Sequence, residues 1–298
     1  MKSAPWYTSS RAIGCAFVLL WCTGYPTGKI ALDHCAPFTL LTLRFGGAGL
    51  VYALFAALGG AVWPRGREAL HSAVVGALSL ALQFAGVYLA IALGVNVGIV
   101  ALVIGTMPIL TALLGRLAGD AIRPLQWLGF VFGFAGVALV VGDRIGSGSE
   151  SAGLGAYVAL FCGLLGISVG TLYQKRFGSA VDLRGGLTIQ HLVATVLLLP
   201  LAWHEGFRFD GSPAFIASLS WLIAINSLAG FALFFVLLRR GAASEVAALF
   251  FLMPPVTALL DYFVLGEAFT VFKAVGFVLA ALGVYLGTHT RSGSAQES

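Results

Sequence analysis

Long apolar stretches alternate with short polar connections along the whole chain. A membrane-crossing helix takes about 20 apolar residues. Ten stretches reach about that length, at 12–32, 37–59, 70–93, 96–117, 124–142, 152–174, 185–203, 213–238, 243–265 and 268–289. The alternating strands of outer-membrane barrels do not occur in this pattern. The sequence therefore predicts an all-α membrane protein with ten transmembrane helices.

Composition supports a lipid environment. The 298 residues are 59% hydrophobic and 10% charged, with a mean hydropathy of +0.96, whereas soluble domains are about 25% charged. A soluble protein this apolar could not cover its surface with polar groups. The first stretch is longer than the roughly 7–15-residue core of a signal peptide, so we expect it to be a retained helix.

Positive charge gathers on alternate connections. With ten helices and a cytoplasmic N-terminus, twelve Lys and Arg residues fall in cytoplasmic segments, whereas only Arg144, Arg208 and Lys273 fall in outer loops. This bias is typical of the positive-inside rule, and it predicts that both termini are cytoplasmic. Topology and anionic lipid headgroups then explain the net charge of +5, without nucleic acid as a partner.

The two halves of the chain are related by an internal repeat. The stretch that begins at Gly94 aligns without a gap with the stretch that begins at Gly241, so that Pro108 meets Pro255. Each half then holds five helices, and this odd number forces the second half to enter the membrane from the opposite side. The sequence predicts two inverted five-helix repeats, 12–142 and 152–289, an arrangement typical of transporters with a site near the membrane midplane.

Prolines interrupt apolar runs at corresponding positions of the two repeats. Met107 and Pro108 lie in the first repeat, and Pro254 and Pro255 lie in the second. A proline in a helix interior costs roughly 3 kcal/mol, and in lipid it is tolerated where the freed backbone groups face protein or a watery cavity. We expect broken helices at a transport site here; a packing kink is the alternative, and both roles can coexist.

Several segments resemble a known family. LLWCTGYPTGKIAL (19–32), APFTLLTLRF (36–45) and GEAFTVFKAVGFVLAALGVYL (266–286) are similar to EamA-type proteins of the drug/metabolite transporter superfamily, and the match runs from about 12 to 288. The resemblance implies export of amino acids or other small metabolites across a bacterial inner (plasma) membrane. Small multidrug exporters of this superfamily rely on a glutamate in the first helix, which this chain lacks, so a cationic-drug antiporter is disfavoured.

The charge expected at membrane depth is positive. No carboxylate falls in the middle of a predicted helix, whereas Lys29 and Arg44 lie within helices. Charged groups at this depth are costly and often functional. Lys29 can extend to the interface. Arg44 either bonds helix-end carbonyls and holds the fold together or attracts the carboxylate of an anionic or zwitterionic substrate.

Aromatic rings with polar groups complete the candidate site, because such side chains line small-molecule pockets well. The predicted substrate-binding residues are Trp21, Tyr25, Arg44, Gln83, Tyr88, Met107, Pro108, Gln190, His191, Asn226, Pro254 and Pro255. His191 is the one histidine within the core of a predicted helix, and an imidazole can carry a proton near neutral pH. It is the first candidate for proton coupling; a neutral histidine that bonds across helices is the alternative.

Other classes of function find little support in the sequence. There is no G-x-x-x-x-G-K-[ST] nucleotide motif, no H-E-x-x-H and no C-x-x-C pair. We therefore expect no cofactor, no metal and no ATP, and we expect a small-molecule substrate and membrane lipids as partners. An intramembrane enzyme and a non-transporting scaffold are the alternatives to a metabolite exporter.

Overall fold

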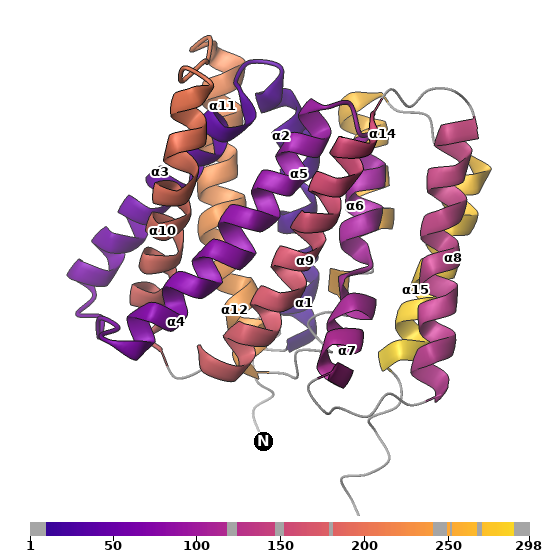
Figure 1. Cartoon of the computed structure of the whole chain (residues 1–298), viewed down its shortest axis with the longest axis horizontal. Helices are drawn as coiled ribbons and strands as arrows, with labels where there is room; N and C mark the ends of the chain where they lie inside the picture. Colours follow the sequence, from indigo (N-terminus) through magenta and orange to yellow (C-terminus); the bar gives the residue numbers. More distant parts are fainter. Residues whose placement is uncertain are drawn as a thin grey trace, which may run out of the picture.

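The computed structural model describes residues 10–117, 124–146, 152–178, 181–240, 249–250, 252–266 and 270–288, and these residues are almost entirely helical (Figure 1). Within them, the one extended feature is an isolated bridge between Cys35 and Phe209. Seven helical segments of this described part are long and apolar enough to cross a membrane, and shorter apolar stretches lie at 127–136 and 274–283. The prediction of an all-α membrane protein is confirmed.

The helices of the first repeat follow the predicted apolar stretches, but several stretches are divided. They are α1 (Ser10–Cys22), α2 (Gly24–Leu32), α3 (Pro37–Leu58), α4 (Arg67–Val75), the π-helix η2 (Gly76–Leu82), α5 (Gln83–Ala92), α6 (Val97–Gly105), α7 (Met107–Leu117) and α8 (Pro124–Gly146). The pairs α1/α2 and α6/α7 each correspond to one predicted helix, and α4, η2 and α5 together form another.

The second repeat has the same order of elements. They are α9 (Leu154–Phe177), α10 (Leu183–His204), α11 (Pro213–Trp221), the π-helix η3 (Leu222–Gly230), α12 (Phe231–Arg240), α14 (Met253–Leu265) and α15 (Val271–Thr288). The N-terminal residues 1–9 and the C-terminal residues 289–298 lie outside the described residues. Segment 241–248, which includes the beginning of the predicted helix 243–265, lies outside them as well.

Polar residues in the short connections fix where several helices begin. Asn96, Asp182 and Ser212 each accept a hydrogen bond from a backbone N–H in the first turn of α6, α10 and α11. These N–H groups have no partner within the helix, so a capping side chain satisfies them. Pro213 follows Ser212 as the first residue of α11, where its missing N–H costs nothing.

Helices of the two repeats pack against each other as a two-fold axis requires. α3 packs on α10, α6 on α14 and α8 on α15, each against its counterpart, whereas α1/α2 pack on α11/η3/α12 and α9 packs on α4/η2/α5. α3 and α10 are antiparallel, because Thr39 at the start of α3 bonds Glu205 after α10, and Gly59 after α3 bonds Arg184 at the start of α10. The two repeats are therefore inverted.

The predicted helix breaks are confirmed. The helix is interrupted at Thr106, directly before α7, and at Leu252, directly before α14. Pro108 and Pro254 are thus the second residues of their helices, where the missing N–H would have no partner within the helix. The two breaks meet, since a Cβ added to Gly105 would lie 2.7 Å from Cγ of Pro254.

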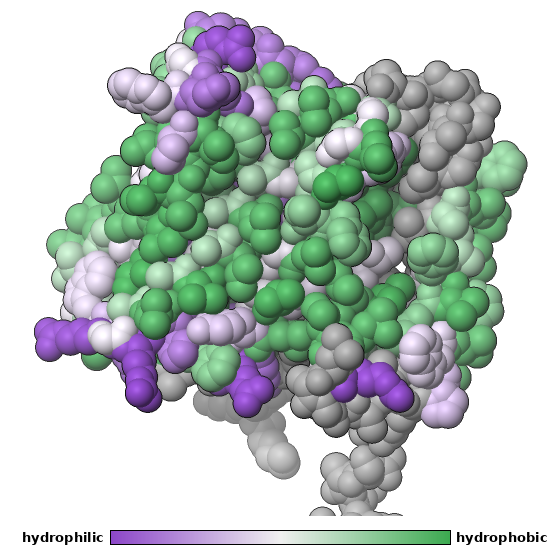
Figure 2. Space-filling view, in the orientation of Figure 1, coloured by the Kyte–Doolittle hydropathy of each residue, from purple (hydrophilic) through white to green (hydrophobic). Residues whose placement is uncertain are grey.

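Glycines bring helices of opposite repeats into close contact. A Cβ added to Gly86 of α5 would lie 2.7 Å from the backbone nitrogen of Gly163 in α9, and a Cβ added to Gly283 of α15 would lie 2.7 Å from that of Gly133 in α8. Helices in membranes gain their packing from such small residues. Figure 2 shows hydrophobic side chains covering the middle of the molecule and hydrophilic side chains at its two ends.

Candidate functional site

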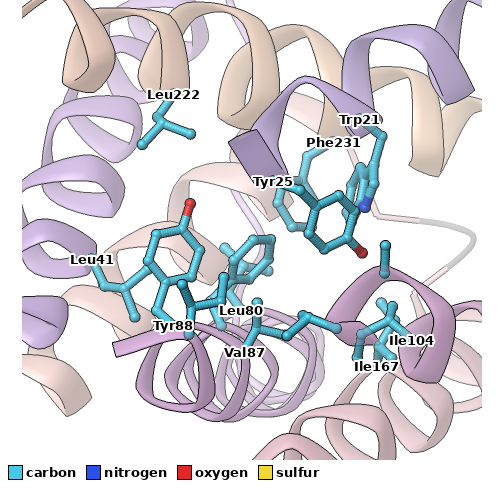
Figure 3. Close-up of a cluster of buried hydrophobic side chains, with 14 of the residues drawn as sticks. Trp21, Tyr25, Leu41, Leu80, Val87, Tyr88, Ile104, Ile167, Leu222 and Phe231 are labelled. Atoms are coloured by element: carbon cyan, nitrogen blue, oxygen red, sulfur yellow. The ribbon is translucent and has the colours of Figure 1, made fainter. Parts of the chain in front are cut away.

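A cavity of about 390 Å³ lies between the two repeats. Its wall is formed by α1, α2, α3, α5 and η3, through Trp21, Gly24, Tyr25, Arg44, Gln83, Phe84, Val87, Tyr88, Ile91 and Asn226. Figure 3 shows Trp21 and Tyr25 on one side of this region and Val87 and Tyr88 on the other. Small-molecule sites in proteins have mostly apolar walls with a few polar groups, as this central cavity has, so it is the candidate site.

The π-helices aim polar side chains at the central cavity. Gln83 directly follows η2, and Asn226 and Ser227 lie within η3. A π-helical turn holds one residue more than an α-helical turn, so it shifts the direction of the side chains that follow, and such turns are frequent at functional sites. Gly24 leaves room for Asn226, since an added Cβ would lie 2.8 Å from Nδ2 of Asn226.

Arg44 is buried in the wall of the central cavity, with 1% of its surface exposed. Its Nε donates to Oγ of Ser227 at 2.8 Å, and its Nη1 donates to the hydroxyl of Tyr88 at 2.9 Å. The guanidinium carbon lies 4.5 Å from the centre of the Phe84 ring, a distance at which the aromatic face attracts a cation. The described partners of Arg44 are therefore two hydroxyls and the rings of Phe84, Phe45 and Tyr88.

The positive charge of Arg44 has no acidic counterpart in its surroundings. Among the ion pairs of the described residues, none includes Arg44. The expected alternative, in which Arg44 bonds helix-end carbonyls, is also not seen within this part of the chain, because its acceptors are side-chain hydroxyls. A buried charge is costly without a partner of opposite sign, so the cavity is suited to an anionic group.

Two amide oxygens of the central cavity lack a hydrogen-bond donor within the described part of the structure. They are Oε1 of Gln83 and Oδ1 of Asn226. Nδ2 of Asn226 donates to the carbonyl oxygens of Leu20 at 2.7 Å and Trp21 at 3.3 Å, and these acceptors fix the orientation of the amide. The cavity thus presents one cation and two unpartnered acceptors, which suits a guest that carries both an anionic group and N–H donors.

The structure brings half of the predicted site residues together. Trp21, Tyr25, Arg44, Gln83, Tyr88 and Asn226 line the central cavity, whereas Met107, Pro108, Gln190, His191 and Pro254 are not in its wall. Met107, Pro108, Pro254 and Pro255 lie at the starts of α7 and α14; the side chain of Pro255 lies outside the described part. Gln190 lines a second, smaller cavity.

His191 lies behind the wall of the central cavity. It is fully buried, its Nδ1 is 2.9 Å from the carbonyl oxygen of Leu187, and its Nε2 has no partner among the described residues. Its ring packs against Phe45 and Phe231, and both of these rings pack against Phe84. An aromatic layer therefore separates His191 from the cavity.

The sequence analysis missed the cavity-lining Gly24, Val87 and Ile91, and it also missed two residues that contact Arg44. Ser227 holds Nε of Arg44, and Phe84 lies under the guanidinium. Both follow a residue that the sequence analysis did select, Asn226 and Gln83. A serine and a phenylalanine are common in any membrane helix, so only the position of the π-helices marks these two.

Polar contacts that involve carboxylates tie the two repeats together at both ends of α3 and α10. At one end, Nδ1 of His34 lies 2.6 Å from Asp210, and hydrogen bonds from the Ser212 backbone and from His34 lower the pKa of Asp210 to about 2. At the other end, Asp182 pairs with Arg184 and accepts from the backbone of Val62. Chiefly because of the Arg184 side chain, the pKa of Asp182 is also about 2.

Comparisons with known proteins agree with this architecture. A family model described as the EamA-like transporter family matches residues 11–142 and 154–288, one match in each repeat. An uncharacterized inner membrane transporter of Escherichia coli K12, YedA, is 29% identical over 91% of this chain and 90% of its own length. The uncharacterized transporter YvbV of Bacillus subtilis is 26% identical over 96% and 93%.

A more distant relative carries a more specific description. A "probable amino-acid metabolite efflux pump" of Escherichia coli K12 is 24% identical over 90% of this chain and 91% of its own length. A solved structure described only as "Crystal structure of protein" shares the fold, with a TM-score of 0.74 and 21% identity over 95% of this chain and 97% of that one. With the family model matching both repeats, this chain belongs to the EamA-like transporter family and is a multi-pass membrane transporter.

Proposed function

We propose that this transporter exports amino acids or similar small zwitterionic metabolites, and that the central cavity binds them. The observation that carries the proposal is the buried guanidinium of Arg44, which has no acidic partner in the described structure and lies in one wall with the unpartnered oxygens of Gln83 and Asn226. A carboxylate is the natural partner of the guanidinium, and an ammonium group supplies the donors that the two oxygens lack.

The rest of the cavity suits the side chain of an amino acid. Trp21, Tyr25 and Val87 provide an apolar and aromatic surface, which accepts an apolar group without a hydrogen bond. The relative described as a probable amino-acid metabolite efflux pump supports this class of substrate.

Alternating access follows from the inverted repeats. In such transporters one half of the protein rocks against the other around a fixed site. The central cavity lies between the halves, and the helix breaks before Met107 and Met253 lie against each other. These breaks are the proposed joints of the movement. We therefore propose that Met107, Pro108, Pro254 and Pro255 contribute to transport through this movement in addition to binding.

The proposed orientation in the membrane comes from the distribution of charge. Arg65, Arg67 and Arg184 lie at the end of the bundle that holds the α3–α4 connection and the start of α10, called the basic end below. By the positive-inside rule this end faces the cytoplasm. The proposal places both termini in the cytoplasm of a bacterium and the protein in its inner membrane, with export driven by the substrate gradient or by protons.

Proton coupling would depend on His191. Its Nε2 is buried and without a partner in the described structure, so a proton there would change the packing of α10 against Phe45 and Phe231. Export that persists unchanged after collapse of the proton gradient would exclude this part of the proposal. Export that depends on the gradient in the wild type and not in His191→Ala would support it.

The experiment that tests the proposal uses purified protein in liposomes. Vesicles are loaded with one radiolabelled L-amino acid at a time, and release is measured for the wild type, for Arg44→Gln and for protein-free vesicles. We expect at least one amino acid to leave faster from wild-type vesicles only. If all twenty leave at the rate of protein-free vesicles, the proposed substrate class is wrong.

A further inference from the structure

A second cavity of about 190 Å³ lies at the basic end of the bundle. α4, the end of α9, the start of α10 and the end of α12 surround it, through Ser72, Gln174, Gln190 and Arg239 among others. These elements come from both repeats. The central cavity uses none of these residues, so the second cavity is a separate feature, called the inner cavity below.

Gln190 places an unpartnered acceptor in the wall of the inner cavity. Its side chain is only 3% exposed. Its Nε2 donates to Oε1 of Gln174 at 3.4 Å, and Nε2 of Gln174 donates to the carbonyl oxygen of Gly178, also at 3.4 Å. This chain of amides fixes which end of Gln190 is the oxygen, and that oxygen has no donor among the described residues. A buried acceptor of this kind is satisfied only by a guest or by water.

Arg239 supplies a positive charge to the same cavity. Its Nη2 donates to the carbonyl oxygen of Val181, which holds the guanidinium at the cavity wall. Asp182 also lines the cavity, but its two oxygens already accept from the backbone and side chain of Arg184 and from the backbone of Val62. Asp182 is therefore paired with Arg184, and its charge also attracts Arg239 across the cavity, although no ion pair joins Asp182 and Arg239 among the described residues.

The inner cavity thus shares two kinds of binding group with the central cavity, although its wall also includes Asp182. Each combines a guanidinium with a buried amide oxygen that lacks a donor in the described structure: Arg44 with Gln83 and Asn226 in one, and Arg239 with Gln190 in the other. The two cavities lie close to each other, because Gln190 adjoins His191, and the ring of His191 packs on the aromatic layer behind the central cavity.

We infer that the inner cavity is a second binding site for the same class of zwitterionic solute, which occupies it before it reaches the central cavity. The carboxylate of the solute pairs with Arg239, and its ammonium donates to Oε1 of Gln190. This inference rests on the proposed function for the class of solute. It adds a site that an exporter with a single central cavity would not have.

Cysteine protection tests the two sites separately. In a background without the four native cysteines, Ser72→Cys reports on the inner cavity and Val87→Cys on the central cavity, and both changes leave the guanidinium and amide groups of the two cavities in place. The probe is an equimolar mixture of the twenty L-amino acids, and the readout is the rate of reaction with a small cationic methanethiosulfonate in nanodiscs. We expect the mixture to slow the reaction at both positions. Ethylamine alone and propionate alone, which each lack one of the two charges, are expected to protect Ser72→Cys less.

Substitution of Gln190 identifies the group responsible. Gln190→Leu removes the acceptor and is expected to weaken protection of Ser72→Cys roughly tenfold, the effect of one lost hydrogen bond to a charged group, with protection of Val87→Cys unchanged. Gln190→Glu keeps an acceptor and should keep the protection. Thr195→Val is the matched control on α10, since the Thr195 hydroxyl bonds only the carbonyl of His191 among the described contacts.

The outcomes separate the inference from the proposed function. If the mixture protects Val87→Cys but not Ser72→Cys, or if Ser72→Cys does not react at all, the inner site is wrong and the proposed function stands. If neither position is protected, both are wrong. Unchanged protection of Ser72→Cys in Gln190→Leu would also overturn the inner site, because its acceptor would play no part.

Discussion

The hydroxyl of Tyr88 accepts a hydrogen bond from Nη1 of Arg44 at 2.9 Å, in the wall of a cavity that crosses the boundary between the two repeats. Tyr88 belongs to α5 and Arg44 to α3, while the other described acceptor of Arg44, Ser227, belongs to the second repeat. Three helices thus hold one guanidinium without neutralising it. The positive charge of Arg44 is therefore available to an anionic group in the cavity.

Replacement of Arg44 by lysine should therefore abolish most of the transport. Arg44→Lys keeps the positive charge but loses the planar fork that bonds Ser227 and Tyr88 and binds a carboxylate through two N–H groups. We expect the rate of amino-acid export from liposomes to fall at least about tenfold, the equivalent of one hydrogen bond between charged groups.

Tyr88→Phe is the matched comparison for Arg44→Lys. It removes one acceptor of the guanidinium and leaves the charge, so the expected loss of export is about fivefold or less, in line with a net hydrogen bond of about 1 kcal/mol. Size-exclusion profiles establish that both variants fold. Export by Arg44→Lys at the wild-type rate would show that the fork geometry of Arg44 does not bind the substrate.

Close contact between α5 and α9 makes Gly86 intolerant of any side chain. In Gly86→Ala, the new Cβ would lie 2.7 Å from the nitrogen of Gly163 and closer still to the carbonyl oxygen of Ala159, so the helices must separate. Overpacking of this kind costs about 1–3 kcal/mol. We expect a lower melting temperature in detergent, measured by tryptophan fluorescence.

Gly155→Ala provides the control in the same helix pair. No heavy atom lies within 4 Å of a Cβ added to Gly155, and alanine favours a helix by about 1 kcal/mol over glycine. Its melting temperature should be unchanged or higher. Equal melting temperatures for Gly86→Ala and Gly155→Ala would mean that α5 and α9 are not as close as the structure has them.

Local patterns predict the fold of this protein well because its strongest constraints are local. Apolar length sets the helices, and the spacing of Pro108 and Pro255 reveals the repeat and the breaks. Six residues of the cavity were predictable because polar or aromatic side chains at membrane depth are few. Ser227 and Phe84 were not, since their roles depend on the π-helices and on contacts between residues nearly 200 positions apart, such as Asn226 with the carbonyl of Leu20.

His191 shows the limit of the same reasoning. Its residue type and its depth in the membrane both favour a functional role, and it is indeed buried between the halves. Its position behind Phe45 and Phe231, however, depends on the rotation of α10. A hydropathy pattern fixes where a helix lies and leaves the direction of an individual side chain to tertiary packing.

Acid should weaken the ties between the repeats. The folded-state pKa of Asp182 and of Asp210 is about 2, below the ordinary value of about 3.9 for an unfolded chain. Each carboxylate therefore stabilises the fold above about pH 4, and this stabilisation is lost as the pH falls toward 2. The melting temperature of the wild type should drop over that window.

The double variant Asp182→Asn/Asp210→Asn isolates this effect. It lacks both carboxylates, so its melting temperature should be lower than that of the wild type at pH 7 and should depend less on pH between 4 and 2. Melting curves in detergent at half-unit pH intervals provide the measurement. Parallel curves for the two proteins over that window would show that other groups govern the acid response.

The inverted topology predicts which loops a membrane-impermeant maleimide can reach in intact cells. In a background without native cysteines, Arg208→Cys lies in the connection between α10 and α11, and Arg65→Cys lies at the opposite end between α3 and α4. We expect Arg208→Cys to react in intact cells and Arg65→Cys to react only after permeabilisation. Reaction of both from the same side would contradict the inverted fold.

The contact between the two helix breaks allows a test of the proposed joint. In Gly105→Ala, the new Cβ would lie 2.7 Å from Cγ of Pro254, and α6 and α14 can no longer slide freely past each other. We expect export to slow several-fold while amino acids still protect Val87→Cys, because the central cavity is unchanged. Pro254→Ala removes the Cγ atom, so the double variant should recover part of the lost rate. Independent sites give effects that add within about 0.5 kcal/mol; additivity here would mean that Gly105 and Pro254 do not act together in the movement.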